Sequence, residues 1–210
     1  MIMRPPDLIV TVGAFGAAAA RLLSGPATRL ADAPPAGREI DLPPATATVV
    51  LAASVPAPAV ELELSRAAHL RDFAFLPVVL DHPRLRVGPV SRAGSRGCST
   101  CYRNRVRQHA ANVSAQEAVE EHHRRHPEVA DRGYLAHWPA LAAALAALAA
   151  QADPADTTRV RHLDLLSNTP LVSRLVPVHG CAVCAPEAAE APQLRSIVRL
   201  RGVVEELETE

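Results

Sequence analysis

Lysine is absent from this 210-residue chain, and aromatic residues make up only 3% of it. All 22 basic side chains are therefore arginines, and 22 acidic side chains balance them to a formal net charge of zero at pH 7. A neutral chain lacks the overall positive field with which many proteins attract nucleic acids or anionic membrane surfaces. The composition therefore predicts no nucleic-acid partner, no membrane partner, and a core built from Ala, Val and Leu.

Targeting signals are missing as well. Met1–Pro6 shows no basic region followed by an apolar stretch and a cleavage site, so no secretory signal peptide is predicted. The longest apolar run, Pro139–Ala150, is shorter than the roughly 20 residues that cross a bilayer as a helix. We therefore expect a soluble, cytoplasmic protein.

Cysteine occurs only in two Cys-x-x-Cys pairs, each preceded by glycine. A Cys-x-x-Cys turn directs two thiolates toward one point, and two such turns supply the four ligands of a tetrahedral zinc ion. Two disulfides and an iron–sulfur cluster are the alternatives, and the first is weaker because Cys-x-x-Cys bridges are mostly redox-active. The predicted metal ligands are Cys98, Cys101, Cys181 and Cys184.

A tetrathiolate site has no open coordination position for water or substrate, so the expected Zn²⁺ is structural. It would fasten two segments that lie far apart in the sequence. All four thiols are used by the metal, so no cysteine remains as a nucleophile. The residues therefore predict no catalytic group and no bound organic cofactor.

The chain opens with a pattern of strand, glycine turn and helix. Asp7–Val12 is an apolar run of strand length, and the small-residue helix that follows Gly13 and Gly16 reaches about Ser24. Rossmann-like units begin in this way. The glycine spacing is not G-x-G-x-x-G, so the turn fits close packing of helix on strand at least as well as a nucleotide loop.

The remaining pattern alternates strands with helices and predicts an α/β fold. It indicates a Rossmann-like core with a mostly parallel sheet, a helical insert between the cysteine pairs, and an antiparallel hairpin across Asp81-His82-Pro83. Further strands are expected at Thr46–Ala52, Phe75–Leu80, Leu85–Val90, Thr158–Leu166 and Leu171–Val178, and further helices at Val60–Leu70, Ser114–His126 (opened by a capping box) and Trp138–Gln151.

The chain divides into a degenerate Rossmann-like part (1–97), a zinc-stapled part with the helical insert (98–185) and an acidic amphipathic tail (186–210), together one compact domain. The Ala/Leu helix within Pro139–Ala150 has hardly any polar face. A neighbouring element or a partner chain has to cover it, and we expect a homodimer or a stable complex with a larger enzyme.

Two clusters of side chains have a functional and a plain interpretation. The first, on a helix rich in Glu and Arg, fits a solvated face better than a metal site; it consists of His122, His123 and His126. The second surrounds the first cysteine pair and would suit a zinc-ribbon protein that binds nucleic acid; it consists of Arg92, Arg96, Arg103, Arg105 and Arg107.

Several motifs in order resemble one protein family. They are Leu76-Pro77-Val78-Val79-Leu80-Asp81, Val87-Gly88-Pro89-Val90, Gly97-Cys98-x-x-Cys101 and Val176-Pro177-Val178-His179-Gly180-Cys181-x-x-Cys184. Together, across about residues 7–185, they resemble the Ocin-ThiF-like "C proteins" of cyclodehydratases. These proteins act in the biosynthesis of thiazole/oxazole-modified ribosomal peptides, including microcins, and are relatives of ThiF and ubiquitin-activating enzymes.

The resemblance implies a ThiF-like core with a zinc site, working beside an ATP-using YcaO-type cyclodehydratase on a precursor peptide. Family members usually begin with a winged-helix module that binds the leader of the precursor. The first strand here is expected at Asp7, so leader binding is expected from another subunit or surface. We expect a non-catalytic scaffold; the alternatives are an adenylating ThiF-like enzyme and the zinc-ribbon nucleic-acid binder.

Overall fold

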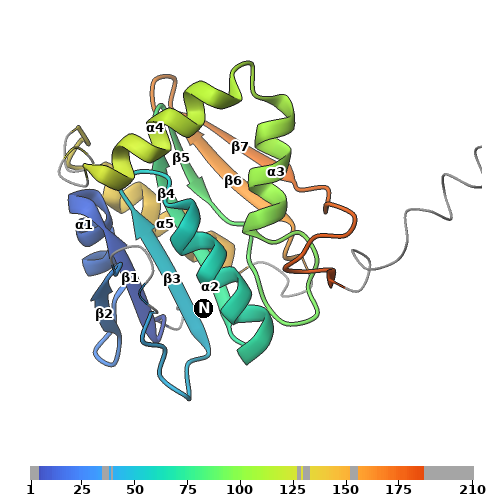
Figure 1. Ribbon diagram of the computed structural model, residues 1–210. Helices are drawn as coiled ribbons and strands as arrows, with labels where there is room; N and C mark the ends of the chain where they lie inside the picture. Colours follow the sequence, from blue (N-terminus) through green and yellow to red (C-terminus); the bar gives the residue numbers. More distant parts are fainter. Residues whose placement is uncertain are drawn as a thin grey trace, which may run out of the picture.

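One seven-stranded sheet with helices on both faces organises the molecule (Figure 1). The structure is a computed structural model that describes residues 5–34, 38, 40–126, 129, 133–151 and 156–186. Within these residues the strand order is β2-β1-β3-β4-β5-β6-β7. The strands are β1 (Leu8–Val12), β2 (Arg29–Asp32), β3 (Thr48–Ala53), β4 (Ala74–Asp81), β5 (Arg84–Val87), β6 (Arg159–Asp164) and β7 (Thr169–Arg174). The helices are α1 (Gly13–Leu23), α2 (Pro58–Arg71), α3 (Ser99–His109), α4 (Val113–Arg125) and α5 (Trp138–Ala150).

Most of the described strands point in one direction. The pairs β2–β1, β1–β3 and β3–β4 are parallel, whereas β4–β5, β5–β6 and β6–β7 are antiparallel. Strand β6 therefore runs with the first four strands, and β5 and β7 run against them. The predicted α/β fold with a mostly parallel sheet is confirmed, as is the antiparallel hairpin across residues 81–83.

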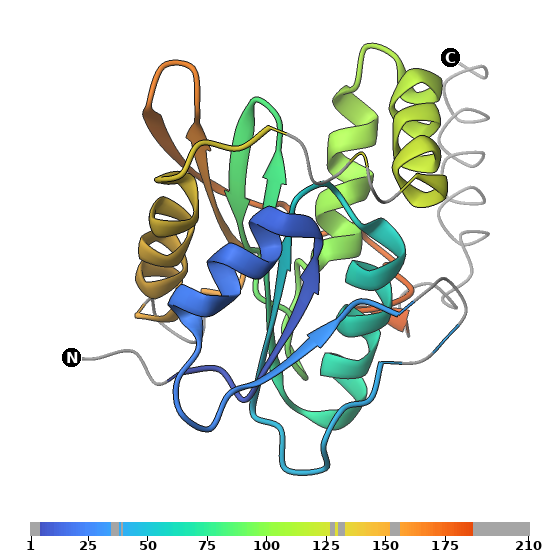
Figure 2. The same cartoon turned by 90° about the vertical axis from the view of Figure 1, so that its left-hand side faces the viewer.

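The buried strands have apolar side chains on both faces, as expected for a sheet covered on each side. Ile9 of β1 and Val50 of β3 pack with α1 and α5 on one face. Leu8 and Leu51 from the same two strands pack on the other face with Leu64 of α2. Figure 2 shows α1 and α5 on one side of the sheet and α2, α3 and α4 on the other.

The apolar helix α5 packs within its own chain. Its buried residues include Trp138, Ala142 and Ala146, which join the core cluster formed with α1 and the sheet. Leu148 remains 54% exposed on the opposite face. The surface that suggested a partner is thus largely covered by α1, and the homodimer stays a prediction. In the described part of the chain, no helix is both long and apolar enough to cross a membrane.

Three details differ from the sequence-based expectations. Strand β2 and helix α3 were not predicted. Helix α4 begins after Asn112, whose side-chain oxygen accepts a hydrogen bond from the Ala115 amide at 2.9 Å. The Ser114 hydroxyl donates to the same oxygen. Asn112 is therefore the N-cap of this helix, where Ser114 was expected. The amphipathic segment Leu194–Glu210 of the predicted tail lies outside the described residues.

Candidate metal centre

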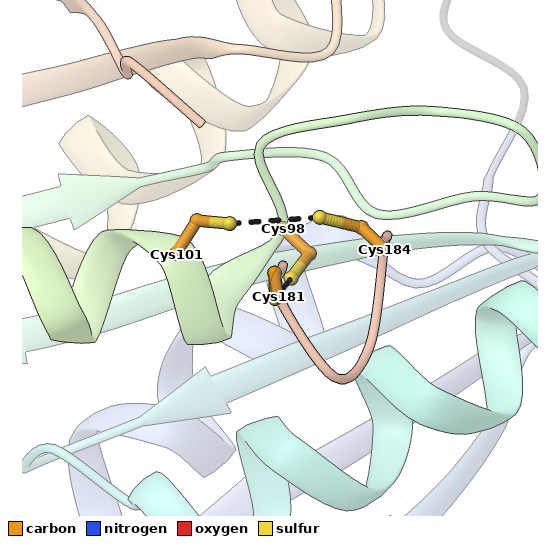
Figure 3. Close-up of side chains that lie close together, drawn as sticks. All are labelled: Cys98, Cys101, Cys181 and Cys184. Carbon is orange, nitrogen blue, oxygen red and sulfur yellow. Dashed lines mark hydrogen bonds between the residues drawn. The ribbon is translucent and has the colours of Figure 1, made fainter. Parts of the chain in front are cut away.

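The two cysteine pairs come from chain segments that follow β5 and β7, two strands that run in the same direction. Cys98 immediately precedes α3, and Cys101 lies in the first turn of that helix. Cys181 and Cys184 lie in the turn that follows β7. Figure 3 shows the four side chains directed toward one another. The fold thus brings together the four residues that the sequence singled out.

The sulfur positions fit one tetrahedral ion. The Sγ atoms of Cys98 and Cys181 are 3.8 Å apart, and those of Cys101 and Cys184 are 3.5 Å apart. All four sulfurs lie within 4.8 Å of one another. A zinc–sulfur bond of about 2.3 Å in tetrahedral geometry places sulfurs about 3.8 Å apart, whereas a disulfide needs about 2.05 Å. The arrangement therefore suits a metal better than two bridges.

The glycine before each pair allows the chain to turn sharply. Gly97 has φ +88° and Gly180 has φ +64°, a region that side chains with a Cβ rarely adopt. A Cβ on Gly97 would also come within 2.9 Å of the methyl group of Thr158, which lies just before β6. Both glycines are therefore part of the construction of the site.

Backbone amides support the sulfurs as thiolates. The Val178 amide donates to the Cys101 sulfur at 3.3 Å, and the backbone at Cys98 and Gly97 is among the groups that lower the pKa of Cys184, after the Cys101 and Cys98 side chains. Such N–H···S bonds are the outer-shell contacts that orient metal ligands. The site thus stabilises negative charge on sulfur through groups that are not themselves ligands.

The thiols cannot all ionise side by side without a cation. Hydrogen bonds with Cys184 and Cys98, together with burial, hold the pKa of Cys101 above its usual range. Hydrogen bonds from Cys101 and then Cys98 hold the pKa of Cys184 below its usual range. The crowded sulfurs of Cys98, Cys101 and Cys184 therefore share protons, and a divalent cation would replace those protons.

The surroundings of the site are apolar and closed. Three of the cysteines are buried, with Val160, Leu175 and Val183 packed around them. The Arg105 side chain ties α3 to the second pair by donating to the carbonyls of Val176 and Pro177 at 3.0 and 3.1 Å. In the described residues, the cysteines are the only cluster of three or more metal-ligating side chains. Such a site can hold a structural ion.

The histidines and arginines of the two side-chain clusters are used differently. Helix α4, which carries His122 and His123, has no buried residue. Of the arginines on α3, Arg103 pairs with Glu120 at 2.7 Å, and Arg107 pairs with Glu117. Their charges are therefore partly neutralised within the chain, which weakens the argument for a nucleic-acid surface.

The glycine turn at the start of α1 is filled by the chain itself. The Ser54 hydroxyl, at the end of β3, accepts from the amides of Phe15 at 3.0 Å and Gly16 at 3.4 Å. A Cβ on Gly16 would overlap the carbonyl group of Ala52. Close packing thus accounts for Gly16, and the amides that would receive a phosphate in a nucleotide loop already have an acceptor.

A buried ion pair beside the metal centre was not predicted. Arg86 of β5 is 3% exposed, and it donates to Glu61 at 2.7 Å and to the Gly88 carbonyl at 2.8 Å. Its guanidinium lies 4.6 Å from the ring centre of Tyr102 on α3. Burial disfavours the charge, but Glu61 offsets this and the pKa of Arg86 is raised. A lone arginine between apolar residues in a strand was the available signal.

Solved structures share this fold. A heterocyclase in complex with substrate and cofactor matches with a TM-score of 0.56 and 17% identity, over 88% of this chain and 25% of that one. The E. coli microcin synthetase McbBCD complex matches with a TM-score of 0.57 and 9% identity, over 85% of this chain and 68% of that one. E. coli MccB with MccA matches with a TM-score of 0.54 and 11% identity, over 87% of this chain and 67% of that one.

These likenesses show the fold. The chain spans about a quarter of the length of the heterocyclases it matches, including TruD at 28%. No protein-family model and no curated protein sequence matches it. The chain therefore has the fold of a part of these peptide-modifying proteins, at low sequence identity.

Proposed function

We propose that this chain is a zinc-stabilised partner protein without catalysis of its own, which serves a YcaO-type cyclodehydratase in azoline-forming peptide biosynthesis. It presents the precursor peptide or activates the enzyme. The observation that carries the proposal is the buried meeting point of Cys98, Cys101, Cys181 and Cys184, on a fold found in solved heterocyclases. The Ocin-ThiF-like motifs in the sequence point the same way.

In this proposal the metal is Zn²⁺, and it supplies a cross-link and a positive charge for four thiolates. The chain's own residues do the rest. Cys98 and Cys101 anchor the start of α3, while Cys181 and Cys184 anchor the segment after β7. Arg105 reinforces the junction through the Val176 carbonyl. The result is a rigid surface that orients a peptide or an enzyme and so reduces the entropic cost of bringing reactants together.

The proposal includes where and with what the chain works. Because zinc thiolates persist in a reducing compartment, we propose a cytoplasmic location. Its partners are the cyclodehydratase and the precursor peptide, with a second copy of the chain as a further partner. Residues 1–97 and 98–185 contribute strands to one sheet and are proposed to act as one unit.

Reconstitution tests this function. The chain, a YcaO-type cyclodehydratase, a precursor peptide and ATP are mixed, and loss of water from the peptide is followed by mass spectrometry. We expect faster dehydration with the chain than without it. Cys181→Ser should abolish the stimulation, whereas Ala182→Ser, which places the same side chain at an exposed position of the same turn, should preserve it. An equal rate without the chain contradicts the proposal.

An adenylating enzyme is the second candidate, favoured by the fold shared with MccB, for which a structure with ATP is known. Against it stand the filled glycine turn and the absence of lysine to contact phosphates. Pyrophosphate exchange by the isolated chain with precursor peptide measures this activity directly. We expect none, and robust exchange that is lost in Gly16→Asp would replace the scaffold with the adenylating enzyme.

A further inference from the structure

The sheet has two outer strands, and they differ in how well they are protected. Among the described residues, β2 and β7 lie at the two ends of the strand order (Figure 1). Strand β2 has four residues and begins and ends with a charged side chain, and its Arg29 forms an ion pair with Asp41 at 2.8 Å. Short, charged strands at the edge of a sheet resist pairing with other chains. The edge at β2 is therefore poorly suited to a further strand.

Strand β7 has the opposite character. All six of its residues are exposed, and in the described part of the chain it pairs with β6 on one side only. Leu171 and Val172, whose side chains lie on opposite faces of the strand, are 59% and 58% exposed. An exposed edge strand with apolar side chains is a template for the addition of another strand. Strand β7 is thus an edge that a further strand can extend.

The ladder with β6 shows which backbone groups of β7 point outward. The Leu175 amide donates to the Thr158 carbonyl at 2.9 Å, so the backbone groups of Leu175 point toward β6. This direction alternates from one residue to the next in an antiparallel ladder, so the even-numbered residues of β7 point away from β6. They are Pro170, Val172 and Arg174. Because proline has no amide hydrogen, the outward donors are the Val172 and Arg174 amides, and all three residues offer a carbonyl.

A second β7 matches these groups when the two strands run antiparallel and are centred on Val172. In that register the two Val172 residues exchange their amide–carbonyl bonds, and each Arg174 amide donates to the Pro170 carbonyl of the other strand. Every outward amide then has an acceptor. Each arginine lies opposite a proline instead of the other arginine, so no like charges face each other directly. The edge is therefore complementary to itself.

We propose that β7 pairs in this way with β7 of a second copy of the chain, which joins the two sheets into one. The outer edges of the joined sheet are then the two β2 strands, so the assembly closes at two copies. A peptide bound in the same place would itself become a new unpaired edge. The pairing names the surface for the second copy included in the proposed function, and it does not depend on the cyclodehydratase.

Two matched valine-to-arginine variants test this surface. Val172→Arg places two arginines opposite each other at the centre of the pairing, whereas Val119→Arg adds the same side chain to α4 at a valine that is 55% exposed. Masses are measured by sedimentation equilibrium over a range of protein concentrations. We expect the parent and Val119→Arg to reach twice the mass of one chain. Val172→Arg should associate at least about tenfold more weakly, because like charges then face each other across the interface.

Both variants change side chains that are more than half exposed, so both should fold. Their melting temperatures at low protein concentration should stay within about 2 °C of the parent. At high concentration the melting temperature of the parent and of Val119→Arg should rise, because association stabilises the folded state. That of Val172→Arg should rise less.

Hydrogen exchange of single amides tests the pairing itself. In one copy the Val172 and Arg174 amides point away from β6 and should exchange rapidly, whereas the Leu171 amide faces β6 and should be protected. Exchange is followed by NMR of the zinc-loaded ¹⁵N-labelled protein at several concentrations. We expect exchange at Val172 and Arg174 to slow at least about tenfold where the mass doubles, with Leu171 as the internal reference.

The outcomes separate the possible occupants of the edge. Slow exchange at Val172 that appears only after addition of the precursor peptide, at the mass of one chain, assigns the edge to a peptide and overturns the second copy. A parent that stays monomeric overturns it as well, as do a dimer that is unchanged in Val172→Arg, a dimer in which the Val172 amide exchanges rapidly, and a mass that grows past two copies. Stimulation of the cyclodehydratase is measured separately, so failure of the pairing leaves the proposed function to its own test.

Discussion

The glycine turn and the cysteine turns are two sharp bends next to helix starts, and the chain uses them in opposite ways. At the glycine turn, Ser54 satisfies the amides of Phe15 and Gly16, and the helix is pressed against Ala52. At the cysteine turns, the Val178 amide donates to the Cys101 sulfur, and the four sulfurs lie close enough to one another to hold a cation. The chain's own Ser54 satisfies the amides of the glycine turn, whereas the cysteine turns form a site that an added cation would fill. A glycine after a strand is thus weak evidence for a ligand until its amides are counted.

The largest expected loss of stability comes from replacing one of the four cysteines. Cys181→Ser removes one ligand and leaves three crowded sulfurs, and we expect a loss of about 4 kcal/mol in the free energy of unfolding, as for other losses of a structural metal. Urea unfolding of zinc-loaded protein, with bound zinc measured by elemental analysis, checks this. Ala182→Ser is the control and should retain both zinc and stability. A variant that melts like its parent rules out a structural metal.

A substitution in the glycine turn at the start of α1 should lower the free energy of unfolding by less. In Gly16→Ala the new methyl group overlaps the Ala52 carbonyl, and the backbone of either α1 or β3 has to shift. We expect a loss of about 2 kcal/mol, typical of overpacking. Ala17→Ser adds one heavy atom at the neighbouring half-buried position and should stay within about 0.5 kcal/mol. Equal stability of the two variants, measured by urea unfolding, would show that α1 does not pack this closely.

The stability of the antiparallel part of the sheet is expected to depend on pH through His162 of β6. Burial, followed by the charges of Arg86 and Arg84, lowers the pKa of His162 from 6.5 to about 4. Between these values the unfolded chain binds a proton that the folded chain does not, so stability falls as the pH decreases from 6.5 toward 4. The imidazole is partly solvated, and we expect a loss of about 1–2 kcal/mol.

If the four cysteines hold a metal, its release at low pH would also destabilise the protein, so the His162 effect is measured as a difference. Parent and His162→Gln are unfolded with urea at several pH values between 7.5 and 4.5. The variant should lose less stability than the parent over this range, because it lacks the titrating group. Parallel curves for the two proteins would contradict the low pKa of His162.

The smallest effect concerns the hydroxyl that completes the glycine turn. Ser54→Ala removes the acceptor of two amides at the start of α1, and we expect a loss of about 1 kcal/mol, as for other helix caps. Ser24→Ala, at the other end of α1, removes a hydroxyl that only donates to the Arg21 carbonyl and should change less. Added ATP should leave the melting temperature of both variants unchanged; a rise in either one would mean that the turn is a nucleotide loop.

The sequence predicted elements that have a buried face. Strands β1, β3 and β4 and helices α1 and α5 all carry apolar patterns, and their positions agree with the expectations to within a few residues. Strand β2 consists of Arg29-Leu30-Ala31-Asp32, is largely exposed and follows no apolar alternation. Helix α3 buries only Ser99 and Cys101, so no periodic stripe marks it. Both elements form because of contacts with neighbouring elements, and the local sequence pattern carries no sign of such contacts.

The candidate sites divide in a similar way. Cysteine spacing predicted that these four side chains would meet, because each Cys-x-x-Cys motif directs two sulfurs toward one point. A cavity of about 170 Å³ beside the metal centre could not be predicted, since Glu61, Arg86 and Ser99, which line it, come from three separate elements. Only the packing of α2 and α3 against β5 brings them together. Motifs within one turn are visible in a sequence, whereas sites assembled across elements are visible only in the fold.

The separation of the cysteine pairs also sets an order of events during synthesis. Cys98 and Cys181 are 83 residues apart along the chain. At about 5–20 residues per second, the second pair leaves the ribosome roughly 4–17 s after the first. During that interval Cys98 and Cys101 have no partner sulfurs and are open to oxidation. If the four cysteines hold a metal, newly made chains depend on a reducing environment until the second pair has emerged.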